Sequence, residues 1–456
     1  MLDIDKSRAT ERDKREKFHQ TDVQVRESAR EGMINWEKRM EVANRISDVR
    51  DYFRLLHEVL VETDWEQCEL HAHFFSIQGP HATLPFLHIE NYEDRYDRAY
   101  LEDDGFDQIV CLHLQALYYI HVAENLENAY ATQTQIMQVF NKEVIQKKKE
   151  ENWFMPIFYQ LCTDLRTLAK KVDDMTVKED DDEGETETTY YEQSASYIME
   201  AFRACVSDVR NDPGTSKKVA ILNMTNQLFR IYFKINKLNL LKPLIRAVEN
   251  AQQSGLYDSF SMADKVSFNY FLGRKAMFDA KLALAESSLL YAFRNCPPEY
   301  VENKRRILIY LIPVKMFLGQ MPKKELLHKY ELDQFVQIVE AVRIGNVKKL
   351  DEALWRDEAF FIQCGIYLML EKLRAIAFRK LFKFCSVLME NHMIHLDVFL
   401  TALRLQNVTD IDCDELECII ANLIYDGRIK GYLSHQHKKL VLSKKEAFPP
   451  LSSIYM

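Results

Sequence analysis

Long amphipathic segments with very few turn-forming residues dominate this 456-residue sequence. From Phe106 onward, apolar residues recur three and four positions apart, as Cys111, Leu114 and Leu117 do. That spacing places them on one face of an α-helix. The chain contains 12 glycines and 11 prolines, and this scarcity favours helices over turn-rich β structure. We therefore expect an all-α protein.

The helices are expected to form antiparallel pairs of roughly 35–40 residues, a length typical of helical repeats. The pattern covers residues 106–145, 190–209, 219–250, 266–296 and 303–322. Each pair has an apolar face that is too wide to leave in water, and stacking on neighbouring pairs would bury it. The sequence therefore predicts a right-handed helical-repeat solenoid of the TPR or HEAT type.

The C-terminal part of the chain has a different pattern, in which three helices precede two strands. The helices are expected at 375–391, 395–406 and 410–428, and the strands at 429–434 and 439–444. Gly427 stands where a glycine cap would end the third helix. The strands alternate between apolar and polar residues around a short turn. Three helices followed by a β-hairpin predict a winged helix at the end of the solenoid.

These patterns divide the chain into five segments. They are a charged N-terminal arm over 1–50, a helical-repeat region over 51–260 with an acidic loop near 177–189, the helical part of a C-terminal domain over 261–375, a winged helix over 376–446 and a tail over 447–456. The arm carries charges of both signs, so we expect a solvated or partly disordered segment, or else a helix that docks on a partner.

The composition and the terminal residues suggest where the protein works. The first residues lack the apolar run of a signal peptide, and the nine cysteines lie scattered without close pairs. We therefore expect reduced thiols in an intracellular protein. The longest apolar run, 307–318, is too short to cross a bilayer and contains Lys315, so no membrane association is expected.

Motifs of common enzymes are missing from the sequence. There is no Gly-x-Gly-x-x-Gly, no Gly-rich loop ending in Gly-Lys-Ser/Thr, no Gly-x-Ser-x-Gly and no His-Glu-x-x-His. We therefore expect no enzymatic activity, no cofactor and no small-molecule substrate.

Two clusters resemble metal sites, but neither meets the requirements of one. Four histidines lie close in sequence at 71, 73, 81 and 88, but a loop with Gly79 and Pro80 separates them, so we expect ordinary surface or half-buried side chains. The run "DIDCDE", 410–415, has Glu415 where a calcium loop needs glycine. Asp412 is instead expected to cap the helix that follows, and no metal is expected.

An acid-free stretch, Pro213–Val248, contains several cations with aromatic residues between them. The candidate partner-binding residues are Arg230, Lys234, Lys237, Lys242 and Arg246. One interpretation is a helix whose aromatic side chains pack inward and whose cations form the solvated face. The other is a surface for an acidic partner, either protein or nucleic acid.

The terminal hairpin, 427–445, also lacks acidic residues, although the chain has a net charge of -9. Its candidate nucleic-acid-binding residues are Arg428, Lys430, Lys438, Lys439, Lys444 and Lys445. Cations on a wing can contact phosphates without reading bases. The third helix begins with several acids, which would oppose insertion into a groove. Alternatively, the lysines only keep an edge strand soluble.

Several blocks of the sequence, in order, resemble one branch of the PCI-domain proteins. They are "NQLFRIYFKINKLNLLKPLIRA", "YFLGRKAMFDA", "NKRRILIYLIPVKMFLGQMP", "EAFFIQCGIYLMLEKL" and "IIANLIYDGRIKGYLSHQHKKLVLSK" followed by "FPPLS". This branch comprises PCI-domain-containing mRNA-export proteins, also described as signalosome-subunit-like. The resemblance covers about residues 100–456 and implies a helical solenoid that ends in a winged helix.

The resemblance also implies a function, a location and partners. It implies a non-enzymatic subunit of the nuclear transcription-and-export complex, located in the nucleus, including the nuclear pore, with some in the cytoplasm. The expected partners are a large scaffold protein with its own winged helix, and a small acidic, mostly disordered protein shared with the proteasome. The stretch 213–248 would suit this acidic companion by charge.

In that family the paired winged helices present a basic platform to RNA or DNA. On this chain the platform maps onto Arg428, Lys430, Lys438 and Lys439, and Lys444 and Lys445 extend the same strand. The alternative is a purely structural subunit of a proteasome-lid-like or signalosome-like assembly, whose hairpin pairs with a neighbour's edge strand.

Overall fold

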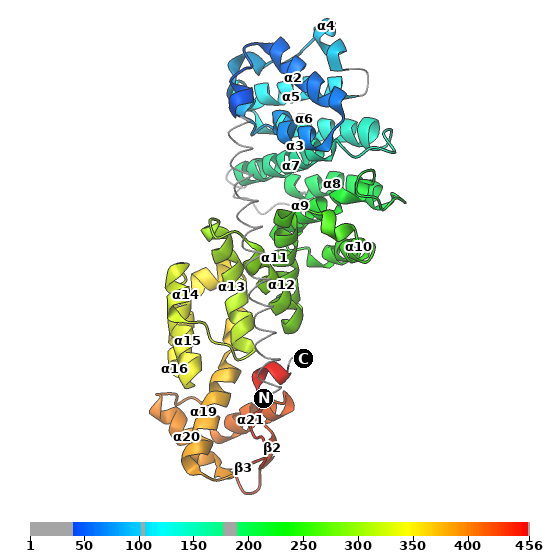
Figure 1. Ribbon diagram of the computed structural model, residues 1–456. Coiled ribbons are helices and arrows are strands. Elements are labelled where there is room, and N and C mark those ends of the chain that lie inside the picture. The colour runs from blue at the N-terminus through cyan, green and yellow to red at the C-terminus, as the bar shows by residue number, and fades with distance from the viewer. Residues whose placement is uncertain (1–39, 102–104, 177–188, 455–456) are drawn as a thin grey trace. The chain divides into compact units, whose positions relative to one another are not determined.

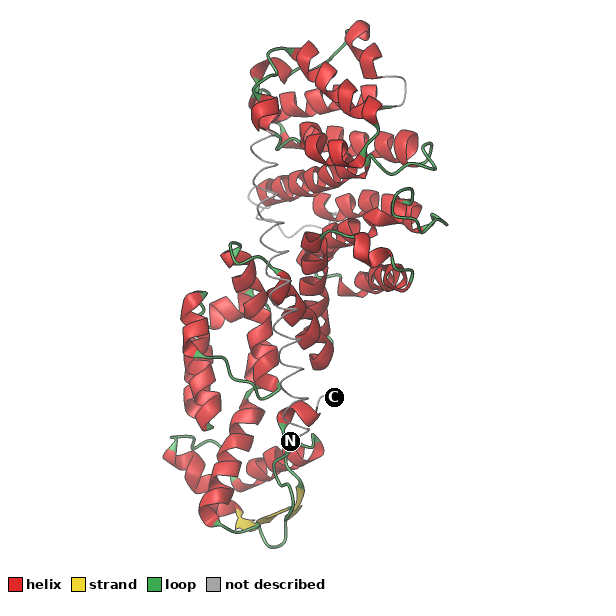
Figure 2. Cartoon of the chain, in the orientation of Figure 1, coloured by secondary structure: helices red, strands yellow, loops and turns green. Residues whose placement is uncertain are grey.

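The computed structural model describes residues 40–101, 105–176 and 189–454, and the chain divides into two compact units at Phe268 and Asn269. Figure 1 follows the chain by residue number, and Figure 2 shows that helices dominate both units. The all-α class is thereby confirmed. The expected boundary between the repeat region and the C-terminal domain, at 260/261, lies within eight residues of the observed division, which falls inside helix α11, Met262–Phe278.

The N-terminal unit is built from helices joined by short turns. Its α-helices are α2 (Val49–Glu62), α3 (Trp65–His71), α4 (Arg95–Arg98), α5 (Phe106–His121), α6 (Leu126–Val139), α7 (Met155–Thr176), α8 (Tyr190–Val206), α9 (Ile221–Lys234) and α10 (Leu241–Gln253). Its short turns are η1 (Ala72–Phe75), η2 (Pro80–Thr83), η3 (Pro85–Leu87), η4 (Ala99–Leu101), the π-type η5 (Phe140–Ile145), η6 (Lys217–Ala220), η7 (Leu238–Leu240) and η8 (Leu256–Ser259).

Successive helices of this unit pack on one another from α5 through α10, and Figure 1 shows them in layers. This order of contacts is consistent with a helical solenoid, whose handedness stays a prediction. Aromatic side chains fill the interior: Phe140 lies 5.3 Å from Phe158 and 6.1 Å from Phe106, measured between ring centroids. The periodic apolar faces therefore form the core, as the sequence indicates.

Parts of two predicted segments lie outside the described residues, namely 1–39 of the arm and 177–188 of the acidic loop. The described end of the arm is ordered. Ala43 and Ile46 are buried, and Asp48 caps α2 by accepting a hydrogen bond from the Asp51 amide. Within residues 40–50, two apolar side chains therefore reach the core, while most of the other residues are exposed.

The C-terminal unit combines helices with one small sheet. After α11 it contains α12 (Leu282–Asn295), α13 (Val301–Phe317), α14 (Lys324–Lys329), α15 (Gln334–Ile344), α16 (Val347–Arg356), α17 (Glu358–Gln363), α18 (Tyr367–Glu371), α19 (Arg374–Met389), β1 (Met393–His395), α20 (Leu396–Leu405), α21 (Cys413–Tyr425), β2 (Gly431–Ser434), β3 (Lys439–Leu442) and η9 (Leu451–Ile454). In the part of the chain that the structure describes, no helix has the length and hydropathy needed to cross a bilayer.

The last part of this unit has the element order of a winged helix. The three expected helices are α19, α20 and α21, and Gly427 ends the third with a left-handed φ of 71°. The two expected strands are β2 and β3. A further strand, β1, was not predicted, and it pairs antiparallel with β3 to give the sheet order β1-β3-β2.

The tail after the wing folds back along the C-terminal unit. The Lys430 amide donates a hydrogen bond to the Ala447 carbonyl, and the buried Arg379 guanidinium donates to the carbonyls of Arg428 and Pro449. Leu451 is buried, and a Cβ added at Gly319, just after α13, would lie 3.3 Å from the Leu451 Cβ. The tail therefore connects the wing to the helices before it.

Candidate nucleic-acid interface

The outer face of the three-stranded sheet carries the side chains best placed to meet a polyanion. Side chains alternate along β3, so Leu440 and Leu442 are buried while Lys439 is exposed. The register places Lys439 between His395 of β1 and Ser434 of β2. This alternation fixes the direction in which the Lys439 side chain faces solvent.

An aromatic side chain shares this outer face. Tyr432 of β2 stands opposite Val441 and is 63% exposed. A solvent-exposed aromatic ring beside a cation offers both a stacking surface and a phosphate contact. Tyr432 is not among the predicted site residues, although the alternation of "IKGYLS" places it on the face opposite Leu433.

Three of the six predicted cations are exposed and make no ion pair with other residues that the structure describes. They are Lys439, Lys444 and Lys445. Lys439 lies on β3, and the other two follow that strand. This is the electrostatic situation that counterion release from a nucleic acid needs.

The other two lysines are paired with the protein's own acids. Lys430 Nζ lies 2.6 Å from Glu446 Oε2, just beyond the acid-free stretch. Lys438 Nζ lies 2.9 Å from Glu417 Oε1 and 3.5 Å from Asp414 Oδ1, both on α21. The expectation that these two amino groups are free of internal carboxylates is therefore wrong.

Glu417 is the centre of the contact between α21 and the turn of the wing. Its carboxylate accepts hydrogen bonds from Lys438 and, at 2.6 Å, from His435 Nδ1. The Lys438 bond, followed by the His435 bond, lowers the pKa of the Glu417 carboxyl, and the Glu417 bond raises the pKa of Lys438. The acids of the third helix thus neutralise part of the wing.

Arg428 does not face outward. It is 8% exposed, and its Nε lies 3.5 Å from Asp426 Oδ2. Arg428 follows the left-handed turn at Gly427, and both it and the next residue, Ile429, are buried. The expectation that Arg428 belongs to the exposed basic surface is wrong for this reason.

All five candidate partner-binding cations are exposed on the N-terminal unit. They are Arg230, Lys234, Lys237, Lys242 and Arg246, from α9 to α10. Lys237 forms an ion pair with Glu192 of α8. Phe229 and Tyr232 are buried, so these two aromatic residues belong to the core and the cations to the solvated face.

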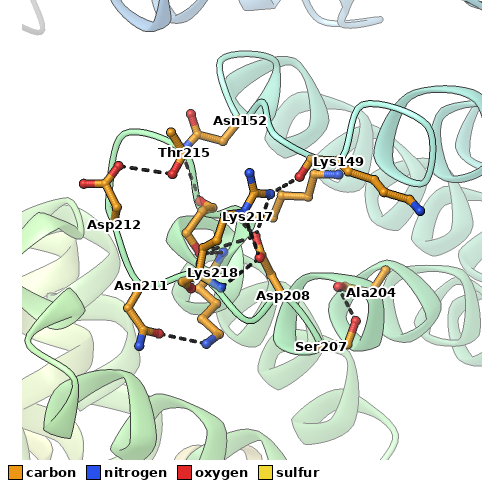
Figure 3. A network of polar contacts seen from close by, with 12 residues as sticks. Lys149, Asn152, Ala204, Ser207, Asp208, Asn211, Asp212, Thr215, Lys217 and Lys218 are labelled. Carbon is orange, nitrogen blue, oxygen red and sulfur yellow. Dashed lines mark hydrogen bonds and ion pairs between the residues drawn. The ribbon is translucent and has the colours of Figure 1, made fainter.

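Two further cations of the same stretch serve the fold. The Lys217 ammonium is buried and donates to the Ile145 carbonyl at the end of η5, and Lys218 donates to Asn211 at 2.8 Å. Figure 3 shows Lys217 and Lys218 in one polar network with Asp208. These two lysines therefore fasten the turn between α8 and α9.

Comparisons with known proteins agree with this domain arrangement. The PCI domain family matches residues 332–444, which run from just before α15 to just beyond β3. A PCI domain-containing protein 2 homolog from Caenorhabditis elegans is 58% identical over 410 residues, which is 90% of this chain and 98% of that protein. The chain belongs to the PCI domain-containing protein 2 family.

Two further relatives match this chain over most of its length. The Xenopus laevis protein is 43% identical over 409 residues, covering 89% of this chain and 98% of that protein. The protein CSN12 homolog of Schizosaccharomyces pombe is 29% identical over 356 residues, covering 76% of this chain and 83% of that protein. The chain is thus similar to a CSN12 homolog as well as to PCI domain-containing protein 2.

One group of potential metal ligands occurs among the described residues, formed by Cys413, Asp414 and Glu417. The Lys438 ammonium contacts both carboxylates of this group, so it supplies the positive charge there. Asp412 caps α21 as predicted, since its Oδ1 accepts a hydrogen bond from the Glu415 amide at 2.8 Å.

The predicted histidine cluster does not come together as a group of three or more potential ligands in the described chain. His88 stacks on His121, with ring centroids 4.7 Å apart. His81 is fully buried, and its Nε2 lies 2.8 Å from Nε2 of His113 on α5. The expectation of surface or half-buried side chains is therefore wrong for His81, which is fully buried, and for His73, which is buried as well.

Proposed function

We propose that this chain is a non-enzymatic subunit of a nuclear, transcription-coupled mRNA-export complex, and that its wing contacts the backbone of RNA or DNA. PCI-domain proteins generally act as scaffold subunits and not as enzymes, which supports the subunit role. The export role, the nuclear location and the association with the nuclear pore rest on the sequence blocks that resemble the export branch.

The observation that carries the nucleic-acid contact is the trio of exposed lysines at Lys439, Lys444 and Lys445, of which Lys439 shares the outer face of the sheet with the exposed ring of Tyr432. Three cations without internal partners can displace counterions from phosphates, and the ring can stack on a splayed base. Such a surface is too small for tight binding alone. We therefore expect a weak, salt-sensitive contact that a second basic surface reinforces.

The partners that we propose are also chosen for charge complementarity with this chain. The exposed cations of α9 and α10 suit a small acidic, disordered companion protein. The winged helix suits a large scaffold protein that brings its own winged helix and so doubles the basic platform. Within the PCI family, this arrangement would assign assembly to the helices and phosphate contact to the wing.

A salt titration of the assembled complex tests the proposal. We expect the affinity for a fluorescein-labelled 20-nucleotide RNA to fall steeply with salt. Lys444→Gln/Lys445→Gln should reduce the slope of log Kobs against log[salt] by roughly one to two, because each lost phosphate contact contributes about 0.7–0.9.

The matched control is Lys348→Gln/Lys349→Gln, which removes two adjacent exposed lysines from α16 and changes the net charge equally. The control should leave the slope unchanged. Equal effects of the two variants would show that overall charge and not the wing is responsible. An intact complex that fails to bind at low salt would overturn the nucleic-acid contact.

A second candidate function, a purely structural subunit, is favoured by one face of α19. Phe384, Val387 and Leu388 lie three and four residues apart on this helix, and all three are more than half exposed. Exposed apolar side chains grouped in this way mark protein contacts. In this role the winged helix would only join a neighbouring subunit.

Two variants separate the two functions. Val387→Glu should abolish assembly with the scaffold if the α19 face is the subunit contact, whereas Lys444→Gln/Lys445→Gln should leave assembly intact. Size-exclusion chromatography of the mixed subunits measures both. Loss of assembly in the lysine variant would favour the structural subunit over the nucleic-acid contact.

A further inference from the structure

Two lysines of the wing are paired with carboxylates, and the two carboxylates differ in how deeply they are buried. Glu446, the partner of Lys430, has a side chain that is 52% exposed, and the Lys430 side chain is 51% exposed. Glu417, the partner of Lys438, has a side chain that is only 11% exposed. Water and salt therefore screen the first pair on both sides, whereas the Glu417 carboxylate is largely shielded from them.

This difference decides which lysine a phosphate can recruit. Lys430 can exchange Glu446 for a phosphate with little loss, because water solvates the released carboxylate. If Lys438 left, the Glu417 carboxylate would stay mostly out of water with the His435 ring as its neighbour. A buried charge that loses its partner is strongly disfavoured. The burial of Glu417 therefore favours retention of Lys438.

The backbone at Lys438 also fixes where its side chain begins. Lys438 closes the turn of the wing with a left-handed φ of 49°, and its amide donates a hydrogen bond to the His435 carbonyl at 3.2 Å. Its own carbonyl accepts a hydrogen bond from the Leu396 amide at the start of α20. Residue 438 is thus held between the wing and the helices, beside the carboxylate that it contacts.

The charges around the Lys438 ammonium sum to a negative value. Glu417 Oε1 lies 2.9 Å from Lys438 Nζ, and Asp414 Oδ1 lies 3.5 Å from the same atom. The hydrogen bond from Lys438, and then that from His435, lower the pKa of Glu417, so this carboxyl stays ionised. With His435 neutral, one cation faces two carboxylates. A phosphate that approached Lys438 would therefore meet net negative charge.

We propose that Glu417 competes internally with the nucleic acid, holding Lys438 out of the binding surface and so keeping the wing's contact weak. The surface then consists of the three exposed lysines of the wing, and Lys430 joins them when a phosphate displaces Glu446. Removing the negative charge at position 417 makes Lys438 a further phosphate contact. This inference rests on the proposed function, because it concerns regulation of the same basic surface.

The experiment compares the parent with Glu417→Gln in the assembled complex, using the fluorescein-labelled 20-nucleotide RNA and fluorescence polarisation. Glutamine keeps a side-chain oxygen that can accept a hydrogen bond from Lys438, while the charge is lost. We expect tighter binding and a slope of log Kobs against log[salt] that is steeper by about 0.7, the value for one further contact with a single strand. The advantage of the variant should thus grow roughly 2.5-fold as salt is lowered from 200 to 50 mM.

Three further variants assign this gain to Lys438. Lys438→Gln alone should change the slope little, because the parent does not use this lysine. Glu417→Gln/Lys438→Gln should lose the gain, which completes a double-mutant cycle. The matched control Glu415→Gln removes one exposed carboxylate from the same helix and should leave the slope unchanged. Size-exclusion chromatography verifies that every complex is assembled.

A second measurement needs no RNA. Acetylation of the full chain by sulfo-N-hydroxysuccinimide acetate, followed by tandem mass spectrometry, reports how readily each lysine amine reacts. Lys438 should react more slowly than Lys439 in the parent. Glu417→Gln should raise the Lys438 rate toward that of Lys439 and leave the Lys439 rate unchanged. Equal rates for the two lysines in the parent would show that Glu417 does not hold Lys438, and would overturn the proposal.

The RNA titrations can overturn the proposal in two further ways. Equal gains from Glu417→Gln and Glu415→Gln would show that net charge alone is responsible. Weaker binding by Glu417→Gln in an intact complex would show that the carboxylate positions the wing for RNA. Binding by Glu417→Gln but not by the parent would contradict the proposed nucleic-acid contact and support the internal competition. Absence of binding by both, at low salt, would overturn both.

Discussion

Two histidines meet inside the N-terminal unit and tie η2 to α5. His81 and His113 share a hydrogen bond between their Nε2 atoms, so one ring donates and the other accepts. Tyr52 stacks on the His81 ring, with centroids 5.2 Å apart. Burial, and then the neighbouring His113, lower the pKa of His81, and burial lowers the pKa of His113 to about 3. Both rings are therefore neutral at pH 7.

This pair predicts that the N-terminal unit loses stability in mild acid. The folded pKa values lie below the ordinary value of 6.5, so the unfolded chain binds protons first as pH falls. The stabilising contribution is complete above pH 6.5 and should decrease by about 1.4 kcal/mol per pH unit for each histidine. Guanidinium titrations at pH 7.5 and 5.5, followed by fluorescence of the buried Trp153, measure it.

The variant His113→Gln should lose about half of this pH dependence, whereas His437→Gln, at an exposed position, should keep all of it. Burial raises the pKa of Asp164 to about 7, so this residue makes the folded state more stable as the pH falls, which is opposite to the effect of the histidines. Asp164 is present in every protein compared, so its contribution cancels. An unchanged slope in His113→Gln would contradict the prediction.

At the scale of the elements, α15 and α19 come close together at a glycine. Gly345 ends α15 with a left-handed φ of 74°, and a Cβ added there would lie 2.7 Å from the backbone nitrogen of Leu381 in α19. Backbone atoms cannot move aside as a flexible side chain can. The packing of these two helices therefore requires glycine for space as well as for conformation.

We expect Gly345→Ala to destabilise the C-terminal unit by more than Gly427→Ala. Gly427 also has a left-handed φ, of 71°, but a Cβ there meets nothing within 4 Å. The Gly427 variant should cost only the conformational strain, about 1–2 kcal/mol. Urea unfolding of both variants tests this difference, and equal losses would show that α15 and α19 can move apart.

The N-cap of α21 carries a further prediction at this scale. Asp412→Ala should lower the free energy of unfolding by about 1 kcal/mol, because the Glu415 amide loses its acceptor. Asp412→Ser should restore most of this stability, and Asp410→Ala, at an exposed position before the cap, should have little effect. Thermal unfolding monitored by circular dichroism distinguishes these cases.

The longer helices were predictable because their apolar periodicity repeats over several turns, as it does in α9 around Phe229. The strand β1, three residues long, offers too short a run for an alternation to show. The wing's lysines were predictable as a group, but their pairing was not. Glu417 and Lys438 lie 21 positions apart, and only the packing of α21 on the turn brings them together. The histidine pair, 32 positions apart, was hidden for the same reason.

At the scale of the whole molecule, the tail links the end of the chain to helices far earlier in sequence. Leu451 packs where Gly319 follows α13, and Arg379 donates hydrogen bonds to both the start of the wing and the tail.

We expect Leu451→Ala to destabilise the C-terminal unit by about 2–3 kcal/mol, as large-to-small changes in cores do. The control Leu405→Ala, at an 82% exposed position, should change stability little. Denaturant unfolding measures both, and equal stability of the two variants would place Leu451 outside the core.

The hydrogen bond from Arg379 to the Pro449 carbonyl also affects the order in which the two units can fold during synthesis. The N-terminal unit can begin to fold while later residues are still being added, because its residues form a compact unit through contacts with one another. The winged helix cannot reach its final state until the ribosome has released the residues around Pro449 and Leu451. A ribosome that stalls before it has released these residues would therefore leave a finished first unit attached to an unfinished second one, with the guanidinium of Arg379 still lacking its Pro449 carbonyl acceptor.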